Sequence, residues 1–422
     1  MFPVFLPDGR HFLFLRTSTV PENNGIYLGS LDAKQEQQGI SRLVATDFAP
    51  VLAPSPNRNE VELLFLRDGA LQAQTFNLVK LQMAGDPVTV AEGVGSYLGF
   101  GFFAASTNGT LIYRGGSGYQ RFQMTWFDRQ GKTLGTEGEP AYLLDGAAFS
   151  PDGKQAAVTL RSPSGRWSNL WLLDFARAGA ATRFTFFERD MDRAPVWSPD
   201  GTRIVFASNR NGMFDLYRKL TNGTRDEEVF LRSDENKSSD DWSPDGHYLL
   251  YRSHSTKSRG DLWILADPGN ATSSGKPMLF QGTDANERDG KFSPDGRWVA
   301  YSSDESGRDE IYVREFALSA EGSRLEPTAK RQISTGGGTF PDWRRDGQEL
   351  IYISNDRRTV MSAEVATTPV FHAGLPRPLF QLPQGALTPA VTVDGQRFLA
   401  PVPVQSAVPE PFTVLVNWSA AE

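Results

Sequence analysis

A five-residue turn motif recurs along the chain and limits what the chain can fold into. It reads Trp or Phe, then Ser-Pro-Asp-Gly, and four intact copies end at Gly153, Gly201, Gly246 and Gly296. Proline presets the backbone for a turn, and the Asp-Gly pair supplies the positive φ of a tight hairpin. An apolar run such as residues 204–207 follows each copy and predicts a strand that is buried on both faces.

Altered copies of the motif flank the intact ones and give the repeat its period. They occupy residues 5–9, 54–57, 105–109, 343–347 and 391–395. Successive turn glycines from Gly109 onward lie about 44–51 residues apart. A period of about 40–50 residues with several strands in each unit is typical of a propeller blade. The sequence therefore predicts an all-β protein, namely a single β-propeller domain over residues 1–422 with about nine four-stranded antiparallel blades.

Eight blades is the alternative count, because closed propellers usually have four to eight. The last repeat offers only three strands, so we expect its outer strand to come from residues upstream of Met1 in a longer protein. A propeller that ends with a three-stranded blade is the alternative. The predicted repeat units are 1–46, 47–93, 94–140, 141–188, 189–234, 235–284, 285–335, 336–384 and 385–422.

Composition narrows the classes of partner and compartment. A net charge of −7 argues against a nucleic-acid partner, which would need a basic surface. No apolar run reaches the 18 residues of a membrane span, so we expect no membrane insertion by these residues. The N-terminal residues lack the pattern of a signal peptide. The absence of cysteine excludes disulfides, zinc-thiolate sites and a cysteine nucleophile.

The usual catalytic motifs are missing from the sequence. None of the four histidines stands in a zinc-binding spacing, and no Gly-x-Ser-x-Gly nucleophile elbow or kinase signature is present. We therefore predict no metal, no cofactor and no enzymatic activity. The aspartates of the intact motif are interpreted as turn residues rather than as a calcium ring, because there is one in each blade. They are Asp152, Asp200, Asp245 and Asp295.

Charged loops of similar length precede the inner strands that end at Trp197, Trp242 and Phe292. In a propeller such loops gather on one face, at the mouth of the central channel, while the Asp-Gly turns lie on the other. Converging polar groups make this mouth the default binding-site hypothesis, and a merely solvated rim is the alternative. The candidate residues for binding a ligand or partner are Asp190, Asp192, Arg193, Glu235, Asn236, Asn286, Glu287 and Arg288.

The repeats resemble the TolB-type propeller repeat. The matching residues are WSPDG at 197–201 and 242–246, and FSPDG at 149–153 and 292–296. A narrower resemblance is to the C-terminal propeller regions of Acidobacteria-type membrane-bound serine/threonine protein kinases. The stretches that carry it include MTWFDRQGK (124–132), WSPDGTRIVFASNRNG (197–212), FSPDGRWVAYSSDESGR (292–308) and QISTGGGTFPDWRRDG (332–347).

In that kinase family a cytoplasmic kinase domain and one membrane helix precede the propeller. The resemblance implies a periplasmic or otherwise extracytoplasmic sensor module, fused upstream to such a domain and helix. We accordingly predict a non-catalytic scaffold that binds a protein or peptide partner. Two alternatives stay open. One is an orphan propeller of a prolyl-oligopeptidase-like hydrolase, and the other is an enzyme that uses loop carboxylates at the channel mouth.

Overall fold

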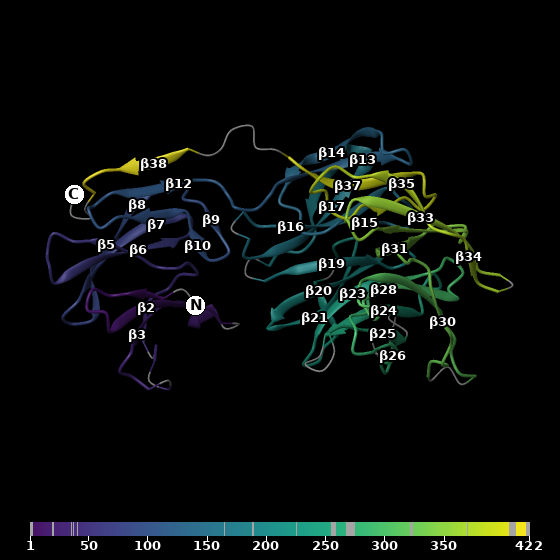
Figure 1. The fold of residues 1–422 in the computed structure, drawn as a ribbon, viewed down its shortest axis with the longest axis horizontal. Coiled ribbons are helices and arrows are strands. Elements are labelled where there is room, and N and C mark those ends of the chain that lie inside the picture. The colour runs from purple at the N-terminus through teal and green to yellow at the C-terminus, as the bar shows by residue number, and fades with distance from the viewer. Residues whose placement is uncertain are drawn as a thin grey trace. The chain divides into compact units, whose positions relative to one another are not determined.

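The fold is β throughout, as Figure 1 shows. The computed structural model describes residues 3–18, 21–34, 36, 38–39, 41–163, 165–187, 190–224, 226–254, 259–266, 275–320, 324–368, 370–404 and 411–418. Within these ranges the helical structure amounts to two short 3-10 turns, η1 (Pro21–Asn23) and η3 (Phe175–Arg177). The remaining regular structure consists of antiparallel sheets, most of them four-stranded. The predicted all-β class is confirmed.

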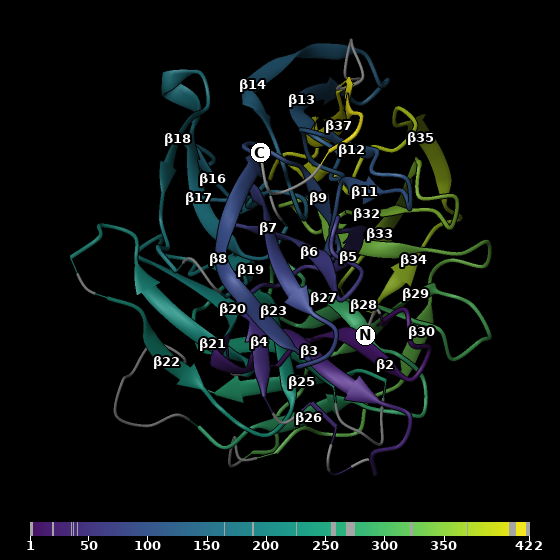
Figure 2. The ribbon, with the colours of Figure 1, turned by 90° about the vertical axis from the view of Figure 1, so that its left-hand side faces the viewer.

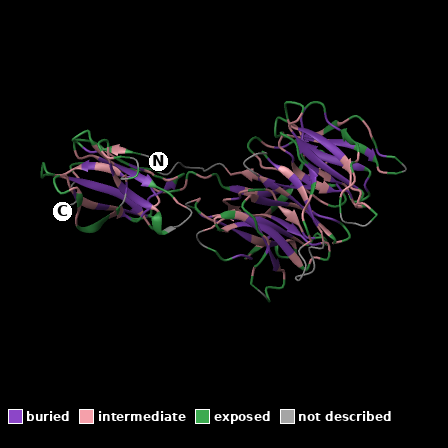
Figure 3. Ribbon diagram, turned by 90° about the horizontal axis from the view of Figure 1, so that it is seen from below, coloured by how far each residue is buried: buried purple, intermediate pink, exposed green. Residues whose placement is uncertain are grey.

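The chain forms two compact units. Unit 1 consists of Met1–Gln120, Pro163–Gly165 and Ser406–Glu422, and unit 2 consists of Arg121–Ser162 and Arg166–Gln405. This division differs from the single domain that the sequence predicts. Each unit has its own apolar clusters, and buried residues run along the centres of the strands in both (Figure 3).

Unit 2 holds six sheets, and five of them are made of consecutive strands. The first two are β15 (Ala148–Phe149), β16 (Gln155–Arg161), β17 (Ser168–Asp174), β18 (Ala180–Arg183), and β19 (Asp192–Trp197), β20 (Arg203–Asn211), β21 (Met213–Leu220), β22 (Glu228–Leu231). The third is β23 (Asn236–Trp242), β24 (Tyr248–His254), β25 (Asp261–Ala266), β26 (Met278–Gln281). The fourth is β27 (Arg288–Phe292), β28 (Trp298–Ser303), β29 (Glu310–Glu315), β30 (Lys330–Gln332). The fifth is β31 (Thr339–Trp343), β32 (Glu349–Ile353), β33 (Thr359–Ala366), β34 (His372–Ala373), β35 (Arg377–Gln381), in which β34 and β35 both pair with β33.

The sixth sheet of unit 2 combines strands from two distant parts of the sequence. Its order is β14-β13-β37-β36, with β13 (Phe122–Asp128), β14 (Thr133–Ala141), β36 (Ala390–Val391) and β37 (Arg397–Pro403). Strands β13 and β37 pair without interruption from Phe122 opposite Pro403 to Asp128 opposite Arg397. Strands β36 and β37 of the predicted ninth repeat thereby join the sheet that contains β13 of the predicted third repeat.

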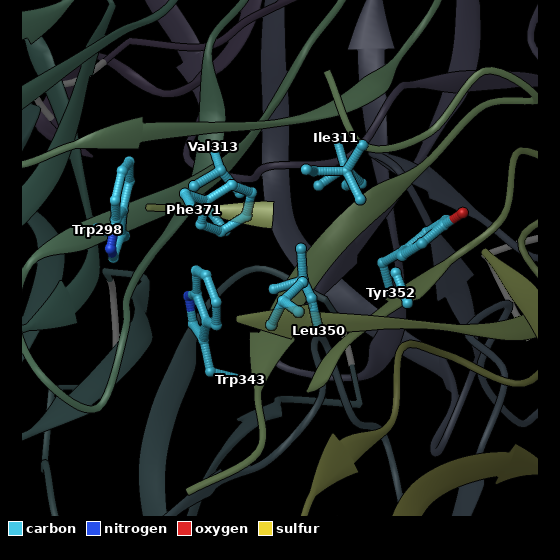
Figure 4. Packing of buried hydrophobic residues seen from close by; sticks show 11 residues of the cluster. Trp298, Ile311, Val313, Trp343, Leu350, Tyr352 and Phe371 are labelled. Carbon is cyan, nitrogen blue, oxygen red and sulfur yellow. The ribbon is translucent and has the colours of Figure 1, made fainter. Parts of the chain in front are cut away.

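Six apolar clusters join the six sheets of unit 2 into a closed ring. Each cluster is shared by two neighbouring sheets, and the sheet β14-β13-β37-β36 shares one cluster with β16–β17 and another with β32–β35. In the cluster of Figure 4, Trp298 and Val313 of one sheet pack with Trp343 and Leu350 of the next, and Phe371 lies among them. Closure of this kind leaves no sheet face uncovered, which is how propellers protect their strands.

Unit 1 contains three sheets joined by two apolar clusters. They are β1 (Val4–Phe5), β2 (His11–Arg16), β3 (Gly25–Ser30), β4 (Arg42–Val44), then β5 (Val51–Pro54), β6 (Glu60–Arg67), β7 (Ala70–Asn77), β8 (Gln82–Ala91), and a three-stranded sheet of β11 (Phe103–Ala105), β12 (Leu111–Arg114), β38 (Phe412–Leu415). Strands β9 (Ser96–Tyr97) and β10 (Phe100–Gly101) form a separate pair. Figure 2 shows β6, β7 and β8 side by side. Among the described residues, no cluster joins the first of these sheets to the third.

The strand pairing corrects the predicted ring of nine blades. Residues 385–422 do not form one blade, because β36 and β37 pair in unit 2 whereas β38 pairs with β12 in unit 1. The physical reason is packing: Leu399 is buried in a cluster of unit 2, and Leu415 packs on a cluster of unit 1. Turn chemistry marks each repeat, but it carries no information on which strands meet across the ring.

The turns themselves have the conformation that the sequence predicts. Gly201 and Gly246 have φ of 70° and 78°, a region that strongly favours glycine. The Asp200 carboxylate accepts hydrogen bonds from the Ser198 hydroxyl at 2.5 Å and from the Thr202 amide at 3.0 Å. The turn role assigned to the repeated aspartates is confirmed by these bonds.

Candidate binding site

In four sheets of unit 2 the first strand, β19, β23, β27 or β31, lies innermost. Strand β19 contacts β23, β23 contacts β27, and β27 contacts β31. In a closed ring of sheets, the inner strands of neighbouring sheets lie close together and the outer strands lie far apart. The strands that contact one another from sheet to sheet are therefore the ones that surround the axis of the ring. Side chains of these inner strands that are not part of the apolar clusters between sheets are therefore the ones that can reach the axis of the ring.

A bulge interrupts four of the inner strands at the same place in the repeat. Ala194, Asp289 and Phe340 lie in or beside these bulges and have φ of 52°, 57° and 53°. Bulges bend a strand and redirect its side chains, so this position places polar groups at the ring axis. The register shifts fall between Arg193 and Val196, Ser239 and Asp241, Arg288 and Lys291, and Thr339 and Asp342.

Two of the predicted site residues are completely buried within the sheets. Asp192 has no exposed surface and forms an ion pair with Arg210, with 3.1 Å between Oδ1 and the guanidinium. Glu287 is equally buried and accepts a hydrogen bond from the Thr283 hydroxyl at 2.6 Å. Burial raises the pKa of Glu287. Both side chains hold the loop to its sheet and leave little for a ligand.

Other predicted residues fasten the loops to one another. The Asn236 Oδ1 accepts from the Phe214 amide at 2.9 Å, and the Asn286 amide donates to Asp304 Oδ1 at 2.9 Å. The Glu235 carboxylate accepts from the Ser253 hydroxyl, and the Asp190 carbonyl accepts from the Ser168 amide. The loops are therefore held in place by their own polar groups.

Arg288 is also held by partners. Its guanidinium lies 2.6 Å from Asp309 and 3.4 Å from Asp289, and its side chain is only 17% exposed. This position differs from the exposed one that the sequence suggests, so a change at Arg288 would disturb structure as well as any surface contact.

Arg193 is the predicted residue that remains available at the ring axis. Its guanidinium stacks on Phe214 at 3.9 Å from the ring centroid, and its Nε has no hydrogen-bond partner within the described part of the chain. Three charged residues that the sequence did not single out lie near Arg193. Asp145 and Arg252 interact electrostatically with Arg193, and Arg252 also interacts with Asp240. We call the four together the inner charged cluster: Asp145, Arg193, Asp240 and Arg252.

Burial shifts the protonation of this cluster. It raises the pKa of Asp240 to about 7, with Asp289 adding to the shift and Arg252 opposing it. Asp145 is exposed and lies within electrostatic range of Arg193 and Arg252. Over the residues described, Asp240 Oδ2 and Arg252 Nε have no hydrogen-bond partner. Unpaired groups with displaced pKa values are typical of functional sites.

A second polar group joins three successive inner strands. Lys291 Nζ lies 3.5 Å from Asp241 Oδ1, and Asp241 Oδ2 accepts a hydrogen bond from the Phe292 amide at 2.8 Å. Burial raises the pKa of Asp342 to about 6, while Lys291 opposes the shift. Because these groups are paired with each other and with the backbone, their role is to tie the inner strands together.

The polar residue that opens each third strand has a role that the sequence did not reveal. The Asp215 carboxylate accepts from the Ser233 amide at 3.3 Å and from Lys237 Nζ at 3.2 Å. Glu310 likewise accepts from the Gly337 amide at 3.0 Å and pairs with Arg308. These carboxylates position the loop that leads to the next inner strand, which explains why the third-strand pattern recurs.

The opposite side of the ring carries a hollow of about 510 Å³ beside the Asp-Gly turns, lined by Asp152, Trp197, Asp200 and Asn222 among others. Its carboxylates already accept the turn hydrogen bonds, so it is the weaker candidate. No group of three acidic or histidine side chains suited to a metal ion occurs in the ranges that the structure covers. No helix in those ranges has the length and apolar character needed to cross a membrane.

Comparison with known proteins supports the fold. Residues 138–265 match the TolB beta propeller domain. The putative TolB from Agrobacterium tumefaciens is 19% identical over 68% of this chain and 100% of its own, with a TM-score of 0.52. TolB from Acinetobacter baumannii is 14% identical over 75% of this chain and 82% of its own, with a TM-score of 0.41. A periplasmic gluconolactonase from Pseudomonas aeruginosa is 14% identical over 76% of this chain and 96% of its own, with a TM-score of 0.42. Residues 138–265 are thus similar to the TolB beta propeller domain, and the chain has a TolB-like propeller fold.

Proposed function

We propose that unit 2 is a non-catalytic binding module for a protein or peptide partner. The partner would engage the side of the ring where the loops before Trp197, Trp242 and Phe292 lie, with the inner charged cluster at its centre. The observation that carries the proposal is this cluster, since Arg193 Nε, Asp240 Oδ2 and Arg252 Nε are buried without a hydrogen-bond partner among the described residues, and an unpaired buried polar atom costs free energy in the free protein. A ligand that pairs these groups would recover that free energy on binding.

The loops support the same proposal. Hydrogen bonds that Asn236 Oδ1 and the Asp190 carbonyl accept, and that the Asn286 backbone amide donates, hold them in place. A rigid rim loses little entropy when a partner binds. Mixed charge at the rim favours a peptide or protein over nucleic acid, given the acidic net charge of −7. The missing nucleophile, metal and phosphate motifs favour binding without turnover.

The family resemblance extends the proposal to a cellular role. Propellers of the membrane-bound kinases follow a membrane helix, so an extracytoplasmic sensor fused upstream to a kinase domain is the setting that we favour. In that setting the partner would be an extracytoplasmic protein or peptide, and no cofactor would be needed.

Capture of partners with matched variants tests the proposal. We expect immobilised protein to retain a specific partner from envelope extract, and Arg193→Glu to weaken the purified complex by about tenfold or more. Arg297→Glu is the charge-matched control, because Arg297 follows the turn Gly296 on the other side and its side chain is 48% exposed. Thermal unfolding of both variants checks the fold, since Arg193 packs on Phe214. Equal affinities for the two variants, or cross-links only to the turn side, would contradict the proposal.

Asp240 favours an enzyme as the second candidate. A carboxyl group with a pKa near 7 and one unpaired oxygen has the properties of a general acid or base. If this candidate is right, purified protein will turn over a substrate and Asp240→Asn will abolish the turnover without loss of binding. Binding that persists with no turnover in the unmodified protein would exclude it.

A further inference from the structure

Arg193 and Arg252 differ from the other arginines that are partly buried in unit 2. Arg210 pairs with Asp192 at 3.1 Å, Arg288 with Asp309 at 2.6 Å, and Arg129 with Glu349 at 2.5 Å. Within the described residues, neither Arg193 nor Arg252 has a carboxylate within ion-pair distance, and the Nε of each is buried without a hydrogen-bond partner. Buried polar atoms normally have a hydrogen-bond partner, so two unpaired guanidinium nitrogens in a single cluster require an explanation.

The two side chains come from adjacent sheets that are in contact. Arg193 belongs to the inner strand β19, and Arg252 stands on β24 opposite Ser238 of the inner strand β23. The Ser239 hydroxyl of β23 donates to the Ala194 carbonyl of β19 and so fixes the two strands to each other. Stacking on Phe214 fixes the plane of the Arg193 guanidinium. The arginines are therefore held near each other by the ring, despite their mutual repulsion.

The pKa shifts of Arg193 and His254 indicate a positive electrostatic potential around Arg193 and Arg252. Burial lowers the pKa of Arg193 and the charge of Arg252 lowers it further, although Asp145 opposes both. His254 lies on the same strand as Arg252, and its pKa is lowered first by burial, then by Arg252, and also by Arg193. The two cations and the neutral histidine lie in the same cluster as Asp145 and Asp240, but within the described residues neither of these carboxylates forms an ion pair with Arg193 or Arg252.

We propose that Arg193 and Arg252 together bind a carboxylate of a peptide ligand at the mouth of the ring, an inference that rests on the proposed binding function. The planar guanidinium fork matches the two oxygens of a carboxylate. A single negative charge suits the site better than a phosphate, because Asp145 and Asp240 would repel a dianion. Asp240 Oδ2, which lacks a partner among the described residues, is then free to accept an N–H of the same peptide.

Chemical modification of arginine tests this assignment on the unaltered protein. Phenylglyoxal reacts with accessible guanidinium groups, so mass spectrometry should find Arg193 and Arg252 modified while the paired Arg210 is protected. Trialanine, which has a free C-terminal carboxylate, should slow the modification of both, whereas trialanine amide should not. A peptide amide with one internal glutamate distinguishes a side-chain carboxylate from a chain terminus, and inorganic phosphate is the test of a dianion.

Variants supply the second measurement. Arg193→Gln and Arg252→Gln should each lower the affinity for the protecting carboxylate peptide by about tenfold, and Arg297→Gln should leave it unchanged. The assignment is wrong if neither carboxylate peptide protects the two arginines, or if phosphate protects them better. Should a captured protein partner still protect the cluster in that case, the binding function stands and only the carboxylate assignment fails.

Discussion

Unit 1 and unit 2 are built from the same repeat, yet only unit 2 closes. Six sheets in unit 2 share six apolar clusters, whereas three sheets in unit 1 share two. The difference lies in strand exchange: β37 returns to pair with β13 along seven residue pairs, while β38 pairs with β12 along four. The comparison teaches that the repeat determines each sheet, and that pairing between distant strands determines the ring.

The consequence of closure appears in the exposure of apolar side chains. In unit 2 the strand residues Val205 and Phe206 are completely buried. In unit 1 the strand β38 leaves Phe412 62% exposed and Val414 53% exposed. Since burial of apolar surface is the main source of stability, we expect unit 2 to be the more stable of the two units and β38 to be among the weakest strands.

The largest expected effect distinguishes the two returning strands. Phe398 of β37 is completely buried and packs edge-on against Phe380 at 5.0 Å between centroids. Phe398→Ala should therefore lower the free energy of unfolding of unit 2 by about 3–5 kcal/mol. The same change at the exposed Phe412 should cost about 0.5 kcal/mol or less. Urea unfolding followed by tryptophan fluorescence measures both, and equal losses would contradict the difference in closure.

Much of this comparison could not be predicted from the sequence. The turn motif gave the class and the strands, because Asp-Gly chemistry and apolar runs are local signals. The same motif predicted nine repeats in a single ring. The turns at Gly109 and Gly395 have similar sequences, but their sheets belong to different units, and the motif does not distinguish them. Pairing of β13 with β37 joins residues more than 250 positions apart, and no local pattern encodes it.

The turn glycines allow a sharper comparison between the units. Gly9 of unit 1 and Gly246 of unit 2 have φ of 65° and 78°, with open space around the position that a Cβ would take. Valine at either site should cost roughly 1–3 kcal/mol, since it resists positive φ. Each change should lower the unfolding midpoint of its own unit alone. Gly336→Val is the control, because Gly336 also has open space but lacks a positive φ, and a cost equal to that at Gly246 would remove the backbone explanation.

A smaller effect, confined to unit 2, is expected from pH. Asp240 has a pKa of about 7 in the folded protein against an ordinary value of 3.8, so the folded state keeps a proton that the unfolded state has lost. Its contribution to stability is complete below pH 4 and is lost as pH rises through 7. Asp240→Asn should therefore stabilise unit 2 relative to the unmodified protein at pH 8 and have little effect at pH 4. Urea midpoints at both pH values check this, and a gain that is the same at pH 4 would contradict it.

The candidate site was predicted in part. Arg193 was among the residues predicted from loop charge, and it is a member of the inner charged cluster that we propose as the centre of the site. Asp192 and Glu287 look equally suitable in the sequence, but neither has exposed surface. Asp192 pairs with Arg210 through Oδ1, and Glu287 accepts a hydrogen bond from Thr283. Asp240 and Arg252 were missed because the observation that singles them out is a buried polar atom without a partner, which only the packing of the ring shows. Asp145 was missed because it lies in no repeated motif.

Hydrogen exchange tests the central claim most directly, because it measures closure strand by strand in one protein. We expect the amides of 398–400 in β37 to exchange as slowly as those of 204–207 in β20, and the amides of 413–415 in β38 to exchange at least about tenfold faster. Slow exchange in β37 would show that this strand closes unit 2. Exchange in β37 as fast as in β38, or uniform protection across both units, would contradict the account.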